Sequence, residues 1–521
     1  MDINRFVADG YSVSTTDGVV KREKGTICRN AVVPTALLRN MDNSLEKVEL
    51  SFFKQNRWRK VVVARSVTAS KNNIIKLADH GIEVNSDNAG DLVRYISACI
   101  GQHMSEIPYL DSKTVMGWVE EEDGKTGFMP YTSSITFDGD EQFGYLYRAI
   151  RKRGSLEEWV KGVQPLRKNL ALRLTMAASF ASPLIEVVGE NPFVFHLWGG
   201  TGTGKSVALL VAMSIWGDPA FGKLTRTMNM TANSMLATAA FLNNLPFAGD
   251  ELQTIKSRWG NYDNLIMQIT EGIDRGRMTY DRLNETRSWR CSFIFSGEEP
   301  CIKTASGGGA KNRCIEVECE GKVVEQGNIA ANFVKQHYGT AGAWFIENLD
   351  KALTRELYED YFEECLATGT TDKQAGAAAL LLTADSMASA LLWGETEQDL
   401  RVEDIAKFLC SADEVDVSER AYSWLVDTIG ENSANFSSGG RVCWGSIEGG
   451  YAYINRSVLD RLLTEQGFDM GAVLNKWETK RYIVRYDSKH LRHMKRIGGV
   501  STSCIKLLMP TDEDEQTELE E

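Results

Sequence analysis

The strongest constraint on the fold of this chain is a glycine-rich loop of eight residues, Gly199 to Ser206, with the sequence Gly-Gly-Thr-Gly-Thr-Gly-Lys-Ser. It fits the pattern G-x-x-x-x-G-K-S, which requires a strand before the loop and a helix after it. The apolar run 193–198 is suited to a buried strand, and the run 207–216 is suited to a helix that stops at Gly217. The sequence therefore predicts an α/β fold built around a P-loop.

Each residue type in this loop has a chemical role. Glycines let successive backbone N–H groups face phosphate oxygens, and the helix N-terminus adds a partial positive charge. Lys205 is placed to reach the β- and γ-phosphates, and the Ser206 hydroxyl to ligate Mg²⁺. We therefore expect ATP and Mg²⁺ as cofactors. The expected nucleotide-binding residues are Gly199, Gly200, Thr201, Gly202, Thr203, Gly204, Lys205 and Ser206.

A second, acidic element is needed for nucleotide hydrolysis, and the segment Leu245–Glu251 supplies it. Its apolar residues predict a strand that ends in the pair Asp250-Glu251. Asp250 is expected to hold the metal through its water shell, and Glu251 to polarise the attacking water. A glutamate beside the metal-binding aspartate favours hydrolysis over nucleotide binding alone.

Two further residues are candidates for a catalytic role. The apolar strand 291–296 ends in Ser296, where P-loop ATPases with a split active site carry a polar residue that senses the γ-phosphate. A simple helix or turn cap is the alternative. The basic segment Ser306–Arg313 is expected to be a flexible loop, with Arg313 as an arginine finger for a neighbouring subunit, a role worth about 10³–10⁵ in rate. A surface arginine at a strand start is the alternative.

An arginine-rich segment lies between the acidic strand and the strand of Ser296. Residues 275–290 contain five arginines and two acidic residues, and the alternation predicts a β-hairpin around Leu283-Asn284-Glu285. In a ring of subunits such hairpins would line the pore and hold single-stranded DNA. A solvated hairpin or an intersubunit salt-bridge element is the alternative. The arginines are Arg275, Arg277, Arg282, Arg287 and Arg290.

The C-terminal region carries a second basic segment. Residues 476–506 contain nine lysines and arginines against two acidic residues, with Trp477, Tyr482 and Tyr486 among them. Two helical runs precede two strand-like runs, which is the order of a winged-helix domain. Such a domain binds duplex DNA or packs against a neighbour. The runs are 458–465, 470–476, 482–484 and 503–508.

Changes in pattern along the chain predict an order of domains. In sequence they are a mixed α/β N-terminal domain over 1–105, linker strands and helices over 106–190, a P-loop ATPase core over 191–325, a helical lid over 326–434, a winged-helix-like domain over 435–510 and an acidic tail over 511–521. Local patterns add a hairpin over 48–63, a strand-like piece at 143–147 and an amphipathic helix over 169–188. Ser155 and Glu158 form an S-x-x-E capping box that marks a helix start.

Composition excludes several classes for this chain of 521 residues. With 71 acidic against 58 basic residues, the net charge is −13. This excludes a histone-like protein that coats DNA through bulk positive charge, so any contact with nucleic acid depends on local basic patches. The ten cysteines include no C-x-x-C pair, which favours reduced thiols in a cytoplasmic protein over disulfides or zinc. Asp385 interrupts the apolar run 375–393, so we expect a buried helix rather than a membrane span.

Several of these motifs together resemble the domain-of-unknown-function 927 family. The similar segments are Gly154–Trp159, Phe195 through the P-loop, Ser214–Pro219, Met230–Asn233, Asp250-Glu251 and Ser296–Glu298. The resemblance is clearest over 105–325 and weaker around Trp58 and His80-Gly81. Members occur in phages, prophages and mobile chromosomal cassettes.

The resemblance carries expectations about activity and assembly. Some members are similar to the minichromosome-maintenance and superfamily-three branch of AAA+ ring helicases, which implies a homo-hexamer translocating on DNA. It places Lys205 and Ser206 in the nucleotide loop and Asp250 with Glu251 in the acidic strand. Ser296 stands where threonine or asparagine is commoner. The sequence carries no zinc-type primase signature, so priming would come from a separate primase or initiator.

Three functions are compatible with these motifs. The leading interpretation is a ring-forming, ATP-dependent DNA helicase in replication of a phage or mobile element, acting on single-stranded and forked DNA. The second is an ATP-switched origin-binding initiator or defence sensor that oligomerises without unwinding. The third is a packaging or remodelling ATPase whose substrate is a protein.

Overall fold

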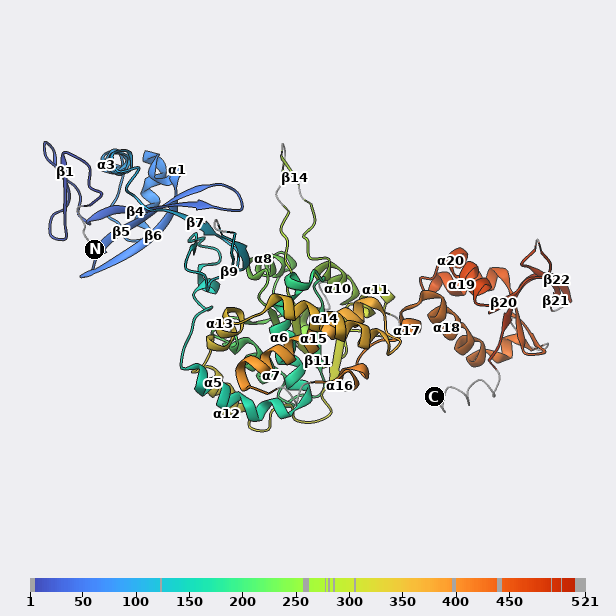
Figure 1. Ribbon diagram of the computed structural model, residues 1–521. Coiled ribbons are helices and arrows are strands. Elements are labelled where there is room, and N and C mark those ends of the chain that lie inside the picture. The colour runs from blue at the N-terminus through green and yellow to red at the C-terminus, as the bar shows by residue number, and fades with distance from the viewer. Residues whose placement is uncertain are drawn as a thin grey trace. The chain divides into compact units, whose positions relative to one another are not determined.

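Figure 1 shows the computed structural model of the chain. It describes residues 5–121, 124–255, 262–276, 278–279, 282–283, 286–303, 306–395, 400–437, 443–488, 490–497 and 499–510. The chain divides into two units. The first comprises Met1–Cys301, Ile315–Phe362 and Gly376–Lys407, and the second comprises Ile302–Cys314, Glu363–Ala375 and Phe408–Glu521.

The N-terminal part of the first unit contains a three-stranded antiparallel sheet and a five-stranded sheet of order β10-β7-β4-β5-β6. The predicted hairpin is present, because β5 (Glu46–Lys54) pairs antiparallel with β6 (Arg57–Ala64). Val48 and Leu50 of β5 belong to one core with residues of α3 (Ala89–Gln102). The other elements are β1 (Tyr11–Ser14), β2 (Gly18–Lys21), β3 (Gly25–Cys28), β4 (Val32–Asn40), α1 (Arg65–Thr68), α2 (Lys71–Ile74), the 3-10 helix Ile75–Ala78, β7 (Tyr109–Lys113) and β10 (Ile135–Phe137).

The strand predicted at 143–147 is wrong, because Gly144–Tyr147 is a short helix, α4. Stacked rings hold this segment: Phe143 stacks on Phe241 with centroids 4.7 Å apart, and Tyr147 stacks on Phe137 at 4.3 Å. Its aromatic residues therefore serve packing rather than strand pairing. Around it lie β8 (Gly117–Glu120), β9 (Thr126–Met129), α5 (Leu156–Val163), whose Ser155–Glu158 capping box forms as predicted, and the 3-10 helix Gln164–Lys168.

A five-stranded sheet forms the centre of the first unit. Its order is β12-β13-β16-β11-β17, and the pairs β12–β13, β13–β16 and β16–β11 are parallel. The strand of Ser296, β16, therefore lies between the strand that leads into the glycine-rich loop and the strand that ends in Asp250. Phe195, Phe247 and Phe293 are fully buried, as expected for a parallel sheet covered on both faces. The strands are β11 (Val194–Trp198), β12 (Thr225–Thr227), β13 (Phe247–Asp250), β16 (Phe293–Gly297) and β17 (Cys314–Glu318).

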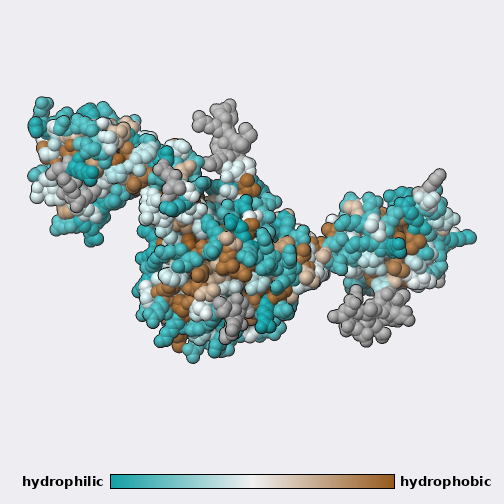
Figure 2. All heavy atoms as spheres, viewed as in Figure 1, coloured by the Kyte–Doolittle hydropathy of each residue, from teal (hydrophilic) through white to brown (hydrophobic). Residues whose placement is uncertain are grey.

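Within the described part of the chain, two helices are long and apolar enough to cross a membrane, but they are mostly buried inside the fold. They are α6 (Leu170–Val188), 78% buried, and the helix Asp372–Trp393, 83% buried. The helix predicted over 169–188 is present and Asn169 caps it, yet it is buried on most of its surface rather than amphipathic. The reason is that α6 packs on α7 (Lys205–Ser214) and on the sheet. On the face shown in Figure 2, polar and apolar residues are interspersed. The helices are therefore core elements.

The other helical elements of the first unit include the two segments that make up the helix Asp372–Trp393. These helical elements are α8 (Ala232–Leu242), the 3-10 helix Leu252–Ile255, α10 (Tyr262–Thr270), α12 (Gly327–Val334), α13 (Thr340–Glu347), α14 (Lys351–Leu366), α15 (Asp372–Ala388), the π-helical turn Ser389–Trp393 and α16 (Val402–Ala406). Two of them, α14 and α15, also contribute residues to the second unit.

Asp385, the charge inside the apolar run, lies in a buried ion-pair network. Its carboxylate accepts from Arg173 Nε at 2.9 Å and lies 3.5 Å from the Arg167 guanidinium. Arg167 also pairs with Glu395 at 2.9 Å and lies over the Trp393 ring at 3.9 Å. The predicted buried helix is therefore present, and two arginines balance its buried charge.

The arginine-rich segment forms the predicted hairpin, but its strands pair in a different register from the one expected. β14 (Met278–Thr279) pairs antiparallel with β15 (Arg282–Leu283), so Leu283 lies in a strand opposite Met278. The bridge between Ile273 and Ser288 at the base has the same register. Thr279 lies opposite Arg282 as well, so the hairpin is not centred on Leu283-Asn284-Glu285 as predicted.

The second unit contains the two helices and two strands predicted near the C-terminus, in the predicted order, and one further strand lies between the two strands in the sequence and pairs with the second. Its elements are α11 (Gly308–Lys311), α17 (Ala412–Val415), α18 (Val417–Glu431), the 3-10 helix Ser433–Phe436, β18 (Gly445–Glu448), β19 (Tyr451–Asn455), α19 (Arg456–Glu465), α20 (Met470–Thr479), β20 (Ile483–Val484), β21 (His493–Ile497) and β22 (Val500–Leu508). β22 pairs with β19, β20 and β21. The flexible loop expected at 306–313 is instead interrupted by the short helix α11.

Helix α18 belongs to the C-terminal core. Its Leu425 and Ile429 are buried in one cluster with Leu463 and Trp477. The indole of Trp477 donates to Ser418 O at 2.8 Å. The boundary expected at residue 435 therefore falls inside a packed unit, since the apolar face of this helix covers α19 and α20.

Candidate active site

The glycine-rich loop joins β11 to α7 in a backbone conformation that its glycines permit. Gly199, Gly202 and Gly204 have φ values of 145°, 83° and 92°, in the region that side chains other than glycine rarely adopt. At position 199 a Cβ atom would also lie 2.9 Å from Cys319 O. Both backbone conformation and close packing therefore require glycine where this loop begins.

The Lys205 ammonium lies inside the loop. It donates to Gly199 O at 2.8 Å, to Gly200 O at 2.7 Å and to Thr203 Oγ1 at 3.2 Å. These oxygens satisfy a cation that is almost fully buried. An ammonium group on a flexible stem has three rotatable donors, so phosphate oxygens can replace the loop carbonyls as its partners.

Asp250, at the end of β13, is the point where three elements meet. Its Oδ1 accepts hydrogen bonds from Ser206 Oγ at 3.1 Å and from Ser296 Oγ. Both Asp250 and Ser296 are buried. The structure therefore brings together the start of α7, the end of β13 and the end of β16. Carboxylate and hydroxyl oxygens are ligands that suit Mg²⁺.

Glu251 follows directly and has an unusual backbone conformation. Its φ of 62° is in the left-handed region, which costs free energy for a residue with a side chain. Thr254 holds this turn, because its N–H and hydroxyl donate to Glu251 O at 3.0 Å and 2.9 Å. The Glu251 side chain is exposed and lines the same cleft as Asp250.

The cleft has a volume of about 440 Å³. The predicted residues on its walls are Thr201, Gly202, Gly204, Lys205, Ser206, Asp250, Glu251 and Ser296. Five polar or charged residues that the sequence interpretation missed also line it, namely Gln253, Glu298, Lys322, Glu325 and Asn328. Gln253 and Glu298 each follow a predicted residue by two positions, which is a usable signal, whereas the other three reach the cleft only through the fold.

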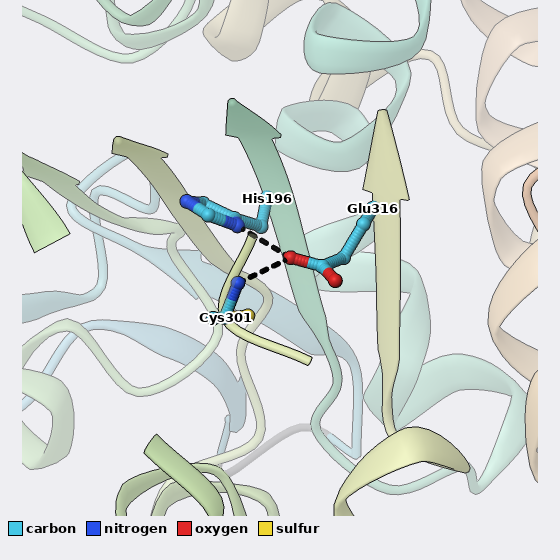
Figure 3. A group of neighbouring side chains, drawn as sticks. All are labelled: His196, Cys301 and Glu316. Carbon is cyan, nitrogen blue, oxygen red and sulfur yellow. Dashed lines mark hydrogen bonds and ion pairs between the residues drawn. The ribbon is translucent and has the colours of Figure 1, made fainter. Parts of the chain in front are cut away.

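A buried ion pair lies on β11, just before the loop. His196 Nδ1 is 2.7 Å from Glu316 Oε1 on β17, and the same oxygen accepts from the Cys301 backbone N–H at 2.7 Å (Figure 3). Burial disfavours the charged imidazole, but the Cys301 side chain and the Glu316 carboxylate outweigh it and raise the pKa of His196 to about 9. His196 is therefore an imidazolium at neutral pH.

The same three side chains are of the kinds that bind zinc, with one ligand atom from each lying within 4.8 Å of the others. Two ligands of one tetrahedral zinc ion lie about 3.3 Å apart, given bonds of about 2.0–2.1 Å. The nitrogen–oxygen distance of 2.7 Å is instead that of a charge-assisted hydrogen bond. The arrangement is therefore an ion pair.

Arg313 lies in the second unit, directly after α11. It is half-buried, and its guanidinium donates to Gly309 O at 2.9 Å. It does not line the cleft described above. Its role as a finger in a neighbouring subunit stays a prediction.

The hairpin arginines differ in their surroundings. Arg275 and Arg287 are exposed near the base of the hairpin. Arg290 pairs with Glu186 at 3.2 Å and donates to Glu190 O at 3.2 Å, so it anchors the base. Of the other two, Arg277 lies outside the described residues, and only the strand backbone is described for Arg282.

The C-terminal basic segment is partly used within its own domain. Trp477 is fully buried, and Tyr482 stacks on Tyr422 with centroids 4.0 Å apart, so these two aromatic residues belong to the core. Lys480 pairs with Asp416 at 3.0 Å. Tyr486, by contrast, is 67% exposed. Only part of the segment is therefore available for DNA.

Comparison with models of protein families shows to which family this chain belongs. The domain of unknown function 927 (DUF927) matches residues 10–288, which is more than half of the chain. The chain belongs to the DUF927 family. The DUF927 match includes the N-terminal sheets, the glycine-rich loop and Asp250-Glu251, so the family extends further toward the N-terminus than the clearest resemblance in the sequence.

Two further comparisons concern the C-terminal region and the whole fold. The Cch helix-turn-helix domain matches residues 416–512. A solved structure described as SCCmec type IV Cch, an active helicase, is similar with a TM-score of 0.73 and 17% sequence identity, covering 96% of this chain and 97% of that chain. The two chains thus share a fold along almost their whole length. No curated protein sequence matches this chain.

Proposed function

We propose that this protein is an AAA+ type P-loop ATPase that works as a ring-forming DNA helicase or translocase in replication of a mobile element. The observation that carries the proposal is the meeting of Ser206, Asp250 and Ser296 through direct hydrogen bonds, beside Lys205 and Glu251 in one cleft. The fold shared with a structure described as an active helicase supports the same activity.

In this proposal the loop binds the triphosphate of ATP, and its glycines leave room for the phosphate oxygens. Lys205 exchanges its loop carbonyls for the β- and γ-phosphates. Ser206 and Asp250 hold Mg²⁺, which neutralises charge on the phosphates. Glu251 orients and polarises the attacking water, and Ser296 positions Asp250 and senses the terminal phosphate.

DNA is held by two separate elements. Arg275 and Arg287 contact the backbone of a single strand, together with Arg277 and Arg282 of the same hairpin, whereas Arg290 anchors its base. In a hexameric ring these hairpins face the pore. The winged-helix-like C-terminal domain binds duplex DNA, and Arg313 completes the ATP site of a neighbouring subunit.

Strand separation of a forked DNA substrate tests the proposal. The wild-type protein with ATP and Mg²⁺ should unwind the fork, and Lys205→Ala should not, because it lacks the cation that binds the phosphates. Equal behaviour of the two proteins would contradict the helicase proposal.

Mixing two inactive variants tests the position of Arg313. The Arg313→Ala protein keeps Glu251, and the Glu251→Gln protein keeps Arg313. If each ATP site uses Glu251 of one subunit and Arg313 of its neighbour, mixed rings contain some complete sites and should recover part of the ATPase activity. Absence of recovery at every mixing ratio would count against a role for Arg313 in the neighbouring site.

The helix-turn-helix domain favours a second candidate function, an ATP-switched initiator that assembles on DNA without unwinding it. Such a protein would form ATP-dependent oligomers on duplex DNA and leave a fork intact. A protein-remodelling ATPase is disfavoured if single-stranded DNA stimulates ATP hydrolysis.

A further inference from the structure

Two buried polar atoms border the same small space beside Gly297, at the end of β16. They are His196 Nε2 and Gln253 Oε1, and neither has a hydrogen-bond partner within the described part of the chain. A methyl group at position 297 would lie 2.9 Å from the first atom and 3.3 Å from the second. The imidazole and the amide therefore face the space that a side chain at position 297 would fill, and the two atoms are not hydrogen-bonded to each other in the structure.

The charge of His196 decides which end of the Gln253 amide faces it. One ring nitrogen is engaged by Glu316, and Figure 3 shows the other pointing away from that carboxylate. An imidazolium donates from both nitrogens, so only the amide oxygen is complementary to it. The Gln253 NH₂ group is then left as a donor for the nucleotide cleft, whose wall Gln253 shares with Glu251 and Ser296.

We propose that Glu316 and His196 are positioning residues that fix Gln253 as a hydrogen-bond donor to the γ-phosphate of bound ATP. The inference rests on the proposed ATPase function and adds a residue to its site. Because Gln253 offers a donor, it binds a phosphate oxygen on which charge develops. Donation to the attacking water would instead occupy the lone pair that forms the new bond.

Steady-state ATP hydrolysis by two Gln253 variants tests the contact with phosphate. Gln253→Ala removes the donor, and Gln253→Glu keeps the shape but replaces the NH₂ group by oxygen. Each should lower kcat by about 10²-fold, as loss of a transition-state donor does, and change KM by less than about threefold because the contact strengthens in the transition state. The control is Gln142→Ala, at an exposed position, which should match the wild type.

The outcomes separate this inference from the proposed function. If the wild type hydrolyses ATP, Lys205→Ala does not, and Gln253→Ala matches the wild type, the inference is wrong and the ATPase stands. If the wild type shows no Mg²⁺-dependent turnover, both fail. A His196→Gln change in the Gln253→Ala background should have little further effect on kcat, since His196 acts through Gln253. If the two changes lowered kcat independently, so that their fold-effects multiplied, His196 would not act through Gln253.

Nuclear magnetic resonance of ¹⁵N-labelled histidine gives a test that needs no turnover. The chain has six histidines, and His196→Gln, or Glu316→Gln if that variant does not fold, identifies the His196 signals. Both ring nitrogens should be protonated at pH 7.5. The Nε2 shift should move in Gln253→Ala and stay unchanged in Gln142→Ala. A His196 Nε2 signal that is indifferent to Gln253→Ala would overturn the proposal.

Discussion

At the scale of single residues, the site depends most on Asp250 and on the conformation of its neighbours. One carboxylate oxygen of Asp250 accepts from hydroxyls on two other elements, so a small shift of β13 changes both contacts. Glu251 takes a strained backbone conformation at the next position. Strain of this kind persists where surrounding structure holds it, and such positions cluster at functional sites.

Gly199→Ala should destabilise the protein even without nucleotide. The new methyl group would meet Cys319 O at 2.9 Å, and a φ of 145° is unfavourable for alanine, so we expect a loss of about 1–3 kcal/mol. Thermal or urea unfolding measures it. The matched control is Gly200→Ala, where a Cβ has nothing within 4 Å. Equal stability of the two variants would contradict the packing argument.

The ion pair of His196 makes stability depend on pH. Its pKa is raised from 6.5 to about 9 in the folded protein, so its contribution is complete below pH of about 6.5 and is lost as the pH rises through 9. The free energy of unfolding should therefore fall between pH 7 and pH 10. Urea unfolding across this range should show the fall in the wild type and a flatter curve in His196→Gln.

The sequence was sufficient for residues whose role follows from local spacing. Lys205 and Ser206 belong to one motif, and Asp250 ends an apolar strand, so their meeting could be predicted. The pairing of His196 with Glu316 could not, because these residues are 120 positions apart and only the adjacency of β11 and β17 joins them. Gln253 was missed although it follows Glu251 by two positions, because its role depends on the buried histidine beside the same glycine, which spacing alone does not show.

At the scale of elements, the sequence predicted where apolar helices lie better than it predicted the partners of the charged residues inside them. Asp385 was recognised as incompatible with a membrane centre, but its partners, Arg167 and Arg173, lie more than 200 positions away. Similarly, the hairpin was expected from alternation, but its centre was misplaced, because alternation is the same for registers that differ by an even number of residues and does not choose between them.

Asp385→Ala should destabilise the first unit strongly. It would remove the buried carboxylate that accepts from both Arg167 and Arg173, and breaking a buried pair by removing one partner costs about 3–5 kcal/mol. Denaturant unfolding followed by tryptophan fluorescence measures the change. Asp360→Ala, at an exposed position of α14, is the control and should have an effect below about 0.5 kcal/mol. Similar losses in both variants would argue against the network.

Arg275 and Arg287 should contribute to binding of single-stranded DNA through phosphates. Replacing both with alanine should weaken binding and reduce the slope of log K against log salt by about 0.7 for each lost contact. Arg290→Ala should affect DNA affinity less, because that guanidinium is engaged by Glu186. Fluorescence anisotropy at several salt concentrations measures both quantities. An unchanged slope in the double variant would show that these two arginines do not contact DNA phosphates.

At the scale of the whole molecule, the order of elements was predicted more accurately than the limits of the units. The α/β core and the C-terminal order of two helices followed by two strands were both predicted from the pattern of apolar residues. The limit placed at 435 was not, because Ser/Gly-rich composition suggests a linker, whereas packing shows where a core ends. Leu425 and Ile429 lie before that limit and are buried with Leu463.

Two C-terminal fragments should therefore differ in folding. A fragment of residues 408–510 contains α18 and should fold and bind duplex DNA, whereas one of residues 435–510 lacks it. The shorter fragment loses the buried side chains of Leu425 and Ile429, whose burial contributes about 3–6 kcal/mol to the free energy of unfolding. This is comparable with the whole stability of a small domain. The shorter fragment also loses the partner of the Trp477 indole, Ser418 O. Circular dichroism should show a cooperative thermal transition for the longer fragment alone. Equal transitions in the two fragments would instead support the predicted domain boundary at residue 435.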